Sequence, residues 1–192
     1  MKNIIISAIV MAFLLVSCNQ KTKESDATTT EKATTEPVKE AATTEAAQAT
    51  FSINELVSNY LALKNALTKD DTKGASTAGK TLYATFNAVN VNSIDAKNKK
   101  DYLDIADDAK EHAEHIGDNG GNIPHQREHF VLLSKDISDL IKTFGATQKL
   151  YQDYCPMADD GKGAIWISEF KEIKNPYEGS KMLTCGSVKK EL

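Results

Sequence analysis

Residues 151–186 read YQDYCPMADDGKGAIWISEFKEIKNPYEGSKMLTCG, and their pattern differs from that of the chain before them. They hold two of the three cysteines, two of the four methionines and the only tryptophan. The runs 151–157 and 164–170 predict two short strands, because the residues between them are the glycines and aspartates typical of a tight turn. A two-stranded hairpin is only marginally stable alone. We therefore expect Trp166 and Phe170 to fix it to the rest of the domain.

The region before this hairpin has the periodicity of helices. Apolar residues recur at steps of three and four along four stretches, which gives each stretch one apolar face. The first predicted helix runs over 52–68. The second begins at an N-cap of Asp70 or Asp71, the third begins at Asp95, and the fourth runs from Pro124 to Gly145. Four amphipathic helices with short links favour an up-and-down bundle. The predicted fold class is thus mainly α, an antiparallel four-helix bundle with a C-terminal β-hairpin.

The first fifty residues are expected to lie outside the folded domain, which we place at 51–192. Residues 1–17 combine an early lysine with a short apolar run, as in a secretory signal peptide. The sequence Leu-Val-Ser-Cys at 15–18 resembles a bacterial lipobox, which implies that Cys18 is lipidated; a cleaved signal without lipid is the alternative. Residues 18–50 are rich in Thr, Ala, Glu and Lys and predict a disordered tether. This predicts a cell-envelope protein, anchored by lipid to the outer or inner membrane and facing the periplasm or the cell surface.

Charge and motifs exclude several function classes. The formal net charge is −4 and there is no basic cluster, which argues against nucleic acid as a partner. The chain has no G-x-S-x-G motif, P-loop or C-x-x-C-H haem site. Residues 125–129, HQREH, match the inverted zinc-peptidase pattern, but no downstream glutamate ligand is evident in the sequence. The sequence therefore predicts a protein that is not an enzyme.

A first candidate metal site lies in the hairpin region. In a strand, residues two apart point to the same side, so Cys155 and Met157 are expected to share a face. If the chain folds back, Met182 and Cys185 join them, and thiolates with thioethers favour Cu(I) or Ag(I). Zinc would accept the cysteines but has little use for methionine. The alternative is a Cys155–Cys185 disulfide with the methionines as core filler.

The histidines form a second candidate site. All four lie within eighteen positions: His112 and His115 near the end of the third predicted helix, His125 and His129 near the start of the fourth. Spacings of three and four place each pair on one helix face. In antiparallel neighbours, both pairs then face the shared groove or both face away. Facing it, three or four imidazoles would bind Cu(II), Zn(II) or Ni(II); facing away, they are solvated helix-end residues.

Several short motifs resemble those of a known family. They are Gln126 to Phe130, Leu133-Ser134, Tyr154-Cys155-Pro156-Met157-Ala158, Trp166, Asn175-Pro176-Tyr177, Gly179, Met182-Leu183 and Cys185-Gly186. Together they resemble a bacterial domain family of unknown function that occurs in Bacteroidetes-type lipoproteins. Similar segments occur in membrane-fusion adaptors of copper/silver efflux pumps. The resemblance implies a helical envelope domain linked to metal handling, with the Cys/Met residues as candidate ligands and His115 and His129 beside family-like segments.

The adaptors' hairpin and barrel segments are missing here, so the resemblance favours a stand-alone binder. We therefore predict a membrane-anchored lipoprotein that binds a soft or transition metal for delivery, storage or efflux. Copper is the expected ion and zinc the less favoured one, and the expected partner is an efflux system or another envelope protein. The alternative is a structural or protein-interaction module held by a Cys155–Cys185 disulfide.

Overall fold

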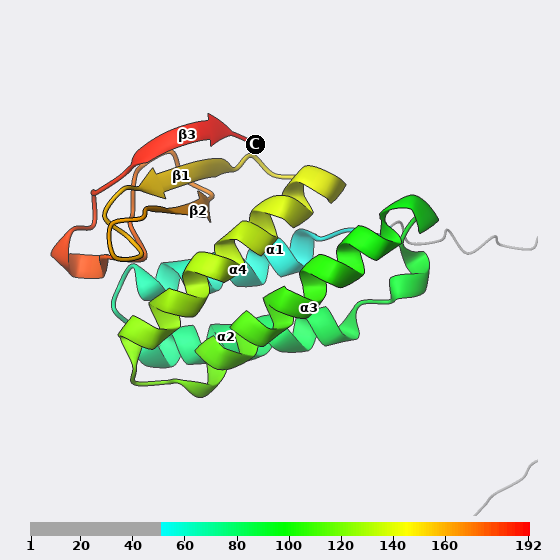
Figure 1. Ribbon diagram of the computed structural model, residues 1–192, viewed down its shortest axis with the longest axis horizontal. Coiled ribbons are helices and arrows are strands. Elements are labelled where there is room, and N and C mark those ends of the chain that lie inside the picture. The colour runs from blue at the N-terminus through cyan, green and yellow to red at the C-terminus, as the bar shows by residue number, and fades with distance from the viewer. Residues whose placement is uncertain (1–50) are drawn as a thin grey trace, which may run out of the picture. The chain divides into compact units, whose positions relative to one another are not determined.

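The computed structural model describes residues 51–192, which form four helices followed by a small sheet (Figure 1). The predicted signal peptide, Cys18 and the predicted tether lie outside the described residues. The helices are α1 (Asn54–Leu67), α2 (Thr72–Ala88), α3 (Ala96–Asp118) and α4 (Ile123–Phe144); the strands are β1 (Tyr151–Cys155), β2 (Ala164–Ser168) and β3 (Ser187–Glu191). Short 3₁₀ turns lie at Val91–Ser93 and Gly179–Lys181. None of the described helices is both long and apolar enough to cross a membrane.

Local signals in the sequence account for the helix boundaries. The side chain of Asp71 accepts a hydrogen bond from the Gly74 N–H at 2.8 Å and caps α2, as predicted. Asn122 caps α4 in the same way, with Pro124 in the first turn. Gly145 ends α4 with a φ of 74°, a backbone conformation that glycine adopts without steric cost. The prediction of a mainly helical protein with four helices is confirmed.

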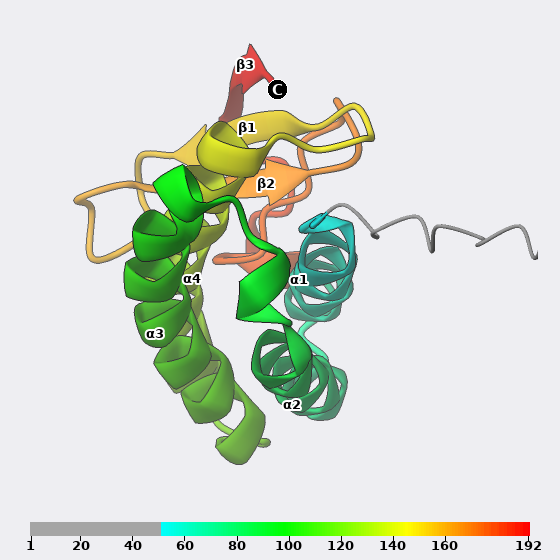
Figure 2. The same ribbon diagram turned by 90° about the vertical axis from the view of Figure 1, so that its right-hand side faces the viewer.

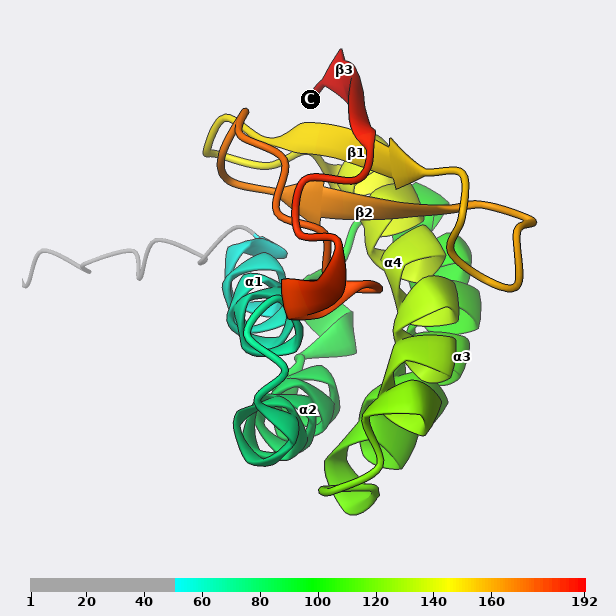
Figure 3. The same cartoon turned by 90° about the vertical axis from the view of Figure 1, so that its left-hand side faces the viewer.

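The helices pack in sequence order, α1 on α2, α2 on α3 and α3 on α4. Figures 2 and 3 show the α1–α2 pair beside the α3–α4 pair, with the sheet lying across α1 and α4. Direct contact between α1 and α4 is sparse, and β2 packs against both of them. In a closed four-helix bundle α1 would pack along α4, but here the sheet covers both helices on that side. The predicted four-helix bundle arrangement is not confirmed for this reason.

The sheet has one strand more than the predicted hairpin. β1 is central, in the antiparallel order β2-β1-β3, and Tyr154 lies opposite Ser187 of β3. β3 reads SVKKE and was missed because it has only one apolar residue, so its sequence shows no strand-like alternation. Charged lysines are what an exposed edge strand tolerates best. The prediction of a two-stranded hairpin is wrong in this respect.

The centre of the core joins α1, α4 and β2. The rings of Tyr60 and Phe130 stack at 5.1 Å, and Trp166 is fully buried as expected. Phe170, also expected to fix the hairpin, is 51% exposed, because β2 already ends at Ser168. Its ring lies instead near the ammonium groups of Lys64 and Lys174, at 5.8 and 5.5 Å.

Gly79 lies at a close contact between α2 and α3. A Cβ at this position would lie 2.9 Å from both the Ala113 carbonyl oxygen and the Gly117 nitrogen. A Gly→Ala change inside a helix ordinarily stabilises by about 1 kcal/mol. Here we expect Gly79→Ala to lower the free energy of unfolding by about 1 kcal/mol, because the two helices must move apart. Urea unfolding measures the change.

The control is Asn87→Ala, on an exposed position of the same helix. It adds helix propensity without touching α3, so it should be neutral or slightly stabilising. Equal, stabilising effects of the two substitutions would show that α2 and α3 have room for a methyl group at their crossing.

Candidate metal centre

The four histidines come together where α3 ends and α4 begins. The short link between the helices, residues 119–122, reverses the chain, so the last turns of α3 lie beside the first turns of α4. His112 and His115 project from α3, and His125 and His129 project from α4. Of the two orientations that the sequence allows, the structure has the one in which both pairs face the shared groove.

His129 lies at the middle of this histidine cluster (His112, His115, His125 and His129). Its Nδ1 is 3.2 Å from Nδ1 of His112. Its ring stacks on that of His115, with centroids 4.3 Å apart and planes within 3°, and its centroid is 4.7 Å from that of His125. One ligand atom each of His115, His125 and His129 lies within 4.8 Å of the others. The removal of His129 would therefore leave the other three without their common neighbour.

These separations fit a transition-metal ion after small side-chain movements. Metal–nitrogen bonds of 2.0–2.1 Å in a tetrahedron place the nitrogens about 3.4 Å apart. One nitrogen each of His115, His125 and His129 lies within 4.8 Å of the others, and the stacked rings of His115 and His129 must rotate out of their parallel arrangement before both nitrogens can point at one ion. The residues present therefore suit an ion held by the three imidazole nitrogens of His115, His125 and His129, with His112 as a neighbour of His129.

Two carboxylates lie behind the imidazoles. Glu128 is 3.2 Å from Nδ1 of His125, and Glu111 is 3.9 Å from Nε2 of His115. Only the Glu128 contact is at hydrogen-bond distance, and an outer carboxylate that accepts from one ring nitrogen fixes the tautomer in which the other nitrogen is free to bind a metal. Glu128 is the glutamate of the predicted HxxEH motif, and in this structure its contact is with a ring nitrogen of His125.

Burial and mutual repulsion keep part of the cluster uncharged. Burial, followed by the charges of the neighbouring histidines, lowers the pKa of His129 to about 4. Burial also lowers the pKa of His112. Both imidazoles are thus neutral at neutral pH, which is the form that binds metal. The side chains of His115 and His125 are 45% and 32% exposed, so an ion has access from solvent.

The structure brings the two domain cysteines together and leaves both methionines in exposed positions. The Sγ atoms of Cys155 and Cys185 are 3.5 Å apart. β1 ends at Cys155, so strand alternation does not extend to Met157, which is 52% exposed and lines a surface pocket of about 320 Å³. Met182 follows the Gly179–Lys181 turn and is 41% exposed. The expectation that Met157 shares a strand face with Cys155 is therefore wrong.

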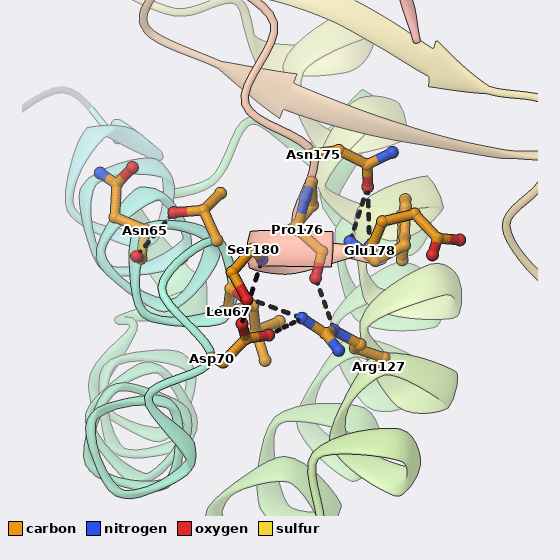
Figure 4. Close-up of polar contacts among 10 residues, drawn as sticks. Asn65, Leu67, Asp70, Arg127, Asn175, Pro176, Glu178 and Ser180 are labelled. Carbon is orange, nitrogen blue, oxygen red and sulfur yellow. Dashed lines mark hydrogen bonds and ion pairs between the residues drawn. The ribbon is translucent and has the colours of Figure 1, made fainter. Parts of the chain in front are cut away.

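Sequence reasoning missed the role of Arg127, which stands between the cluster residues of α4. Figure 4 shows its guanidinium pointing toward the α1–α2 turn and the segment after Asn175. It donates to the carbonyl oxygens of Pro176 and Leu67 at 2.7 and 3.1 Å, and to the Asp70 carboxylate at 2.6 Å. Arg127 therefore fixes the first turns of α4, which also carry His125 and His129, against two other parts of the fold.

Residues 56–149 match the family model described as "Protein of unknown function (DUF3347)". A DUF3347 domain is thus found over these residues, just under half of the chain. The DUF3347 domain contains all four histidines and ends before β1, so the cysteine pair lies beyond it. The predicted domain family of unknown function is confirmed to this extent, whereas lipidation and the link to efflux adaptors stay predictions. Comparisons with curated proteins and with solved structures found no match.

Proposed function

We propose that this protein is a membrane-anchored, non-enzymatic lipoprotein that binds a transition-metal ion, copper in preference to zinc, at the histidine cluster. The convergence of four imidazoles from two adjacent helices supports the proposal above all. The bound ion serves delivery, storage or efflux in the cell envelope. An efflux system or another envelope protein is the corresponding partner.

The arrangement of the cluster favours ligation over solvated helix-end histidines. The chain has only four histidines, and all of them meet at this one place. Histidines without a ligand role at helix ends would point to solvent, where water hydrates their charged forms. Here His112 and His129 are partly desolvated against each other, an arrangement that a shared cation stabilises.

The donor set favours Cu(II) among the common divalent ions. Imidazole suits copper, nickel and zinc, and for a given set of nitrogen ligands the affinity is highest for Cu(II). The partial exposure of His115 and His125 allows the ion to exchange, which suits delivery or storage better than a purely structural role. The cysteine pair is not needed for this site, because three imidazole nitrogens and a ligand from solvent are sufficient to hold the ion.

Titration of the mature protein with Cu(II), Zn(II) and Ni(II) tests this function. We expect one Cu(II) per chain by native mass spectrometry, and tighter binding of Cu(II) than of Zn(II) by calorimetry. His129→Ala should weaken Cu(II) binding by about 100-fold or more, because it removes the central ligand, and outer-shell changes alone cost 10–100-fold. Glu128→Gln should weaken it by about 10-fold.

The matched control is the double variant Cys155→Ala/Cys185→Ala. It removes the other candidate site and should leave Cu(II) stoichiometry and affinity unchanged. Absence of binding to the wild-type protein, or unaltered binding by His129→Ala, would refute a metal site in the histidine cluster. Loss of binding in the cysteine variant alone would move the site to the thiols.

A further inference from the structure

The two domain thiols meet at the edge of the sheet, outside the histidine cluster. Cys155 is the last residue of β1, and Cys185 lies two residues before β3 begins. Tyr154 and Ser187 are register partners in these neighbouring antiparallel strands, which brings the residues beside them close together. The two Sγ atoms lie 3.5 Å apart, and both cysteines are free in this structure.

We propose that Cys155 and Cys185 are a redox pair that is oxidised to an intramolecular disulfide by exchange with a thiol–disulfide oxidant. The Cys185 thiolate attacks a disulfide of the oxidant, forms a mixed disulfide and releases one oxidant thiolate. The Cys155 thiolate then attacks the Cys185 sulfur and releases the second. The protein loses two protons and two electrons, and the oxidant disulfide is reduced to two thiols.

Accessibility sets the order of attack. Cys155 is fully buried, whereas Cys185 is half-buried and meets the oxidant first. The hydrogen bond with Cys155, followed by burial, raises the pKa of Cys185, so little of it is thiolate at neutral pH. Cys155 lies behind Cys185 and is therefore the resolving thiol.

The backbone around Cys185 is held in place, so closure of the bond requires mainly side-chain rotation. The side-chain amide of Asn175 donates to the Cys185 carbonyl oxygen at 2.7 Å. Gly186 has a φ of 139°, and a Cβ there would lie 2.8 Å from the Trp166 ring and 2.9 Å from the Tyr154 carbonyl oxygen. A disulfide requires the sulfurs to approach to about 2.05 Å. Rotation about the side-chain bonds of the two cysteines provides this movement.

The bond would close a loop that contains β2 and the segment covering it. A loop of about thirty residues restricts the unfolded chain enough to raise Tm by about 10 °C for a domain of this size. The Asn175–Cys185 hydrogen bond and the Arg127–Pro176 hydrogen bond lie within or at the rim of this loop. Oxidation therefore stabilises the segment after Asn175, which Arg127 of α4 contacts through the Pro176 carbonyl oxygen.

The test is incubation of the reduced mature protein with oxidised glutathione, followed by thiol counting, mass spectrometry and a thermal scan. We expect both domain thiols to disappear, the mass to fall by about 2 Da, and Tm to rise by about 10 °C in a way that a reductant reverses. Cys155→Ser should trap a mixed glutathione disulfide on Cys185, and Cys185→Ser should leave Cys155 unmodified. Cys155→Ala/Cys185→Ala is the control whose Tm should not respond to the reductant.

Two free thiols in the folded wild-type protein after this treatment, with both reactive in the urea-unfolded protein, would overturn the proposal. Protection of both thiols by Cu(I), together with their failure to react with oxidised glutathione in the metal-free protein, would overturn it and assign them to a soft metal ion instead. The result is independent of the proposed metal function, because His129→Ala should oxidise as the wild type does.

Discussion

Replacement of Arg127 by methionine should lower the free energy of unfolding by about 2 kcal/mol, less than the roughly 3–5 kcal/mol found for fully buried ion pairs, because the Asp70 side chain is 35% exposed. The Arg127 side chain is only 15% exposed and lies against three acceptors from two other parts of the fold. Methionine keeps the aliphatic stem but removes every donor. The Asp70 carboxylate then loses its cation, and the carbonyls of Leu67 and Pro176 lose the guanidinium (Figure 4).

The matched control is Lys142→Met, on the same helix. Lys142 pairs with Asp139 at 2.6 Å, but both side chains are more than half exposed. An exposed pair of this kind contributes about 0–1 kcal/mol. Urea unfolding of the two variants compares a buried cation with an exposed one in the same helix. Equal losses of stability would mean that the Arg127 contacts contribute no more than a surface ion pair.

The pH dependence of the Arg127 effect has a defined sign. Hydrogen bonds from Ser180, together with Arg127, lower the pKa of Asp70 to about 2, below its value in the unfolded chain. A lowered folded-state pKa contributes stability above the unfolded value, near pH 4, and this contribution is lost as the pH falls toward 2. The stability difference between wild type and Arg127→Met should therefore shrink over this interval.

The sequence was sufficient for the helices and for the histidine cluster because both depend on local spacing. Asp71 and Gly145 act on their own helix ends, and a short link between consecutive helices forces the two histidine pairs to the same end. The sequence did not decide whether the two histidine pairs face the groove between α3 and α4 or face away from it. It depends on the rotation of α3 against α4, which the packing of many side chains determines.

The missed features all depend on partners distant in sequence. β3 is recognisable only through its pairing with β1, since its sequence is mostly polar. Lys64 occupies an apolar face of α1 and is fully buried, yet its partner Glu169, at 2.6 Å, follows β2 about a hundred residues later. Arg127 likewise meets Asp70 and Pro176 only after the sheet has folded onto the helices. No local pattern encodes such contacts.

These long-range polar contacts lie on the side where the sheet meets α1 and α4. The Tyr60 hydroxyl accepts from the Ile167 N–H and is hydrogen-bonded to the Ser134 hydroxyl at 2.8 Å. Buried polar groups of this kind specify one docking of the sheet, because any shift leaves them unpaired. The sheet is thus positioned by hydrogen bonds as well as by apolar burial. Within residues 51–192, Asp153 of β1 and Trp166 of β2 both have buried polar atoms on this side without a hydrogen-bond partner.

Asp153→Asn should stabilise the protein above pH 7 by about 3 kcal/mol, because a pKa raised from 3.8 to about 6 corresponds to about 1.4 kcal/mol for each unit. Asp153 is fully buried, and neither of its carboxylate oxygens has a hydrogen-bond partner among the described residues. Burial raises its pKa from 3.8 to about 6, although the charge of Lys64 opposes the shift. The folded protein therefore favours the protonated carboxyl, and ionisation above pH 6 costs folding free energy.

The sign of the pH effect follows from the raised pKa. The group is protonated in both states below about pH 3, and it adds a penalty to folding as the pH rises through the unfolded pKa of 3.8 to about 6. Asparagine is neutral throughout, so the stability of Asp153→Asn minus that of the wild type should be near zero at pH 3.5 and level off above pH 7. Urea unfolding across this range measures the difference.

The control is Asp107→Asn, on a side chain that is 85% exposed, which should change stability by less than about 0.5 kcal/mol at pH 8. A difference for Asp153→Asn that stays flat with pH would mean that the buried carboxylate is hydrogen-bonded in solution, for instance by an internal water molecule, and costs the fold nothing.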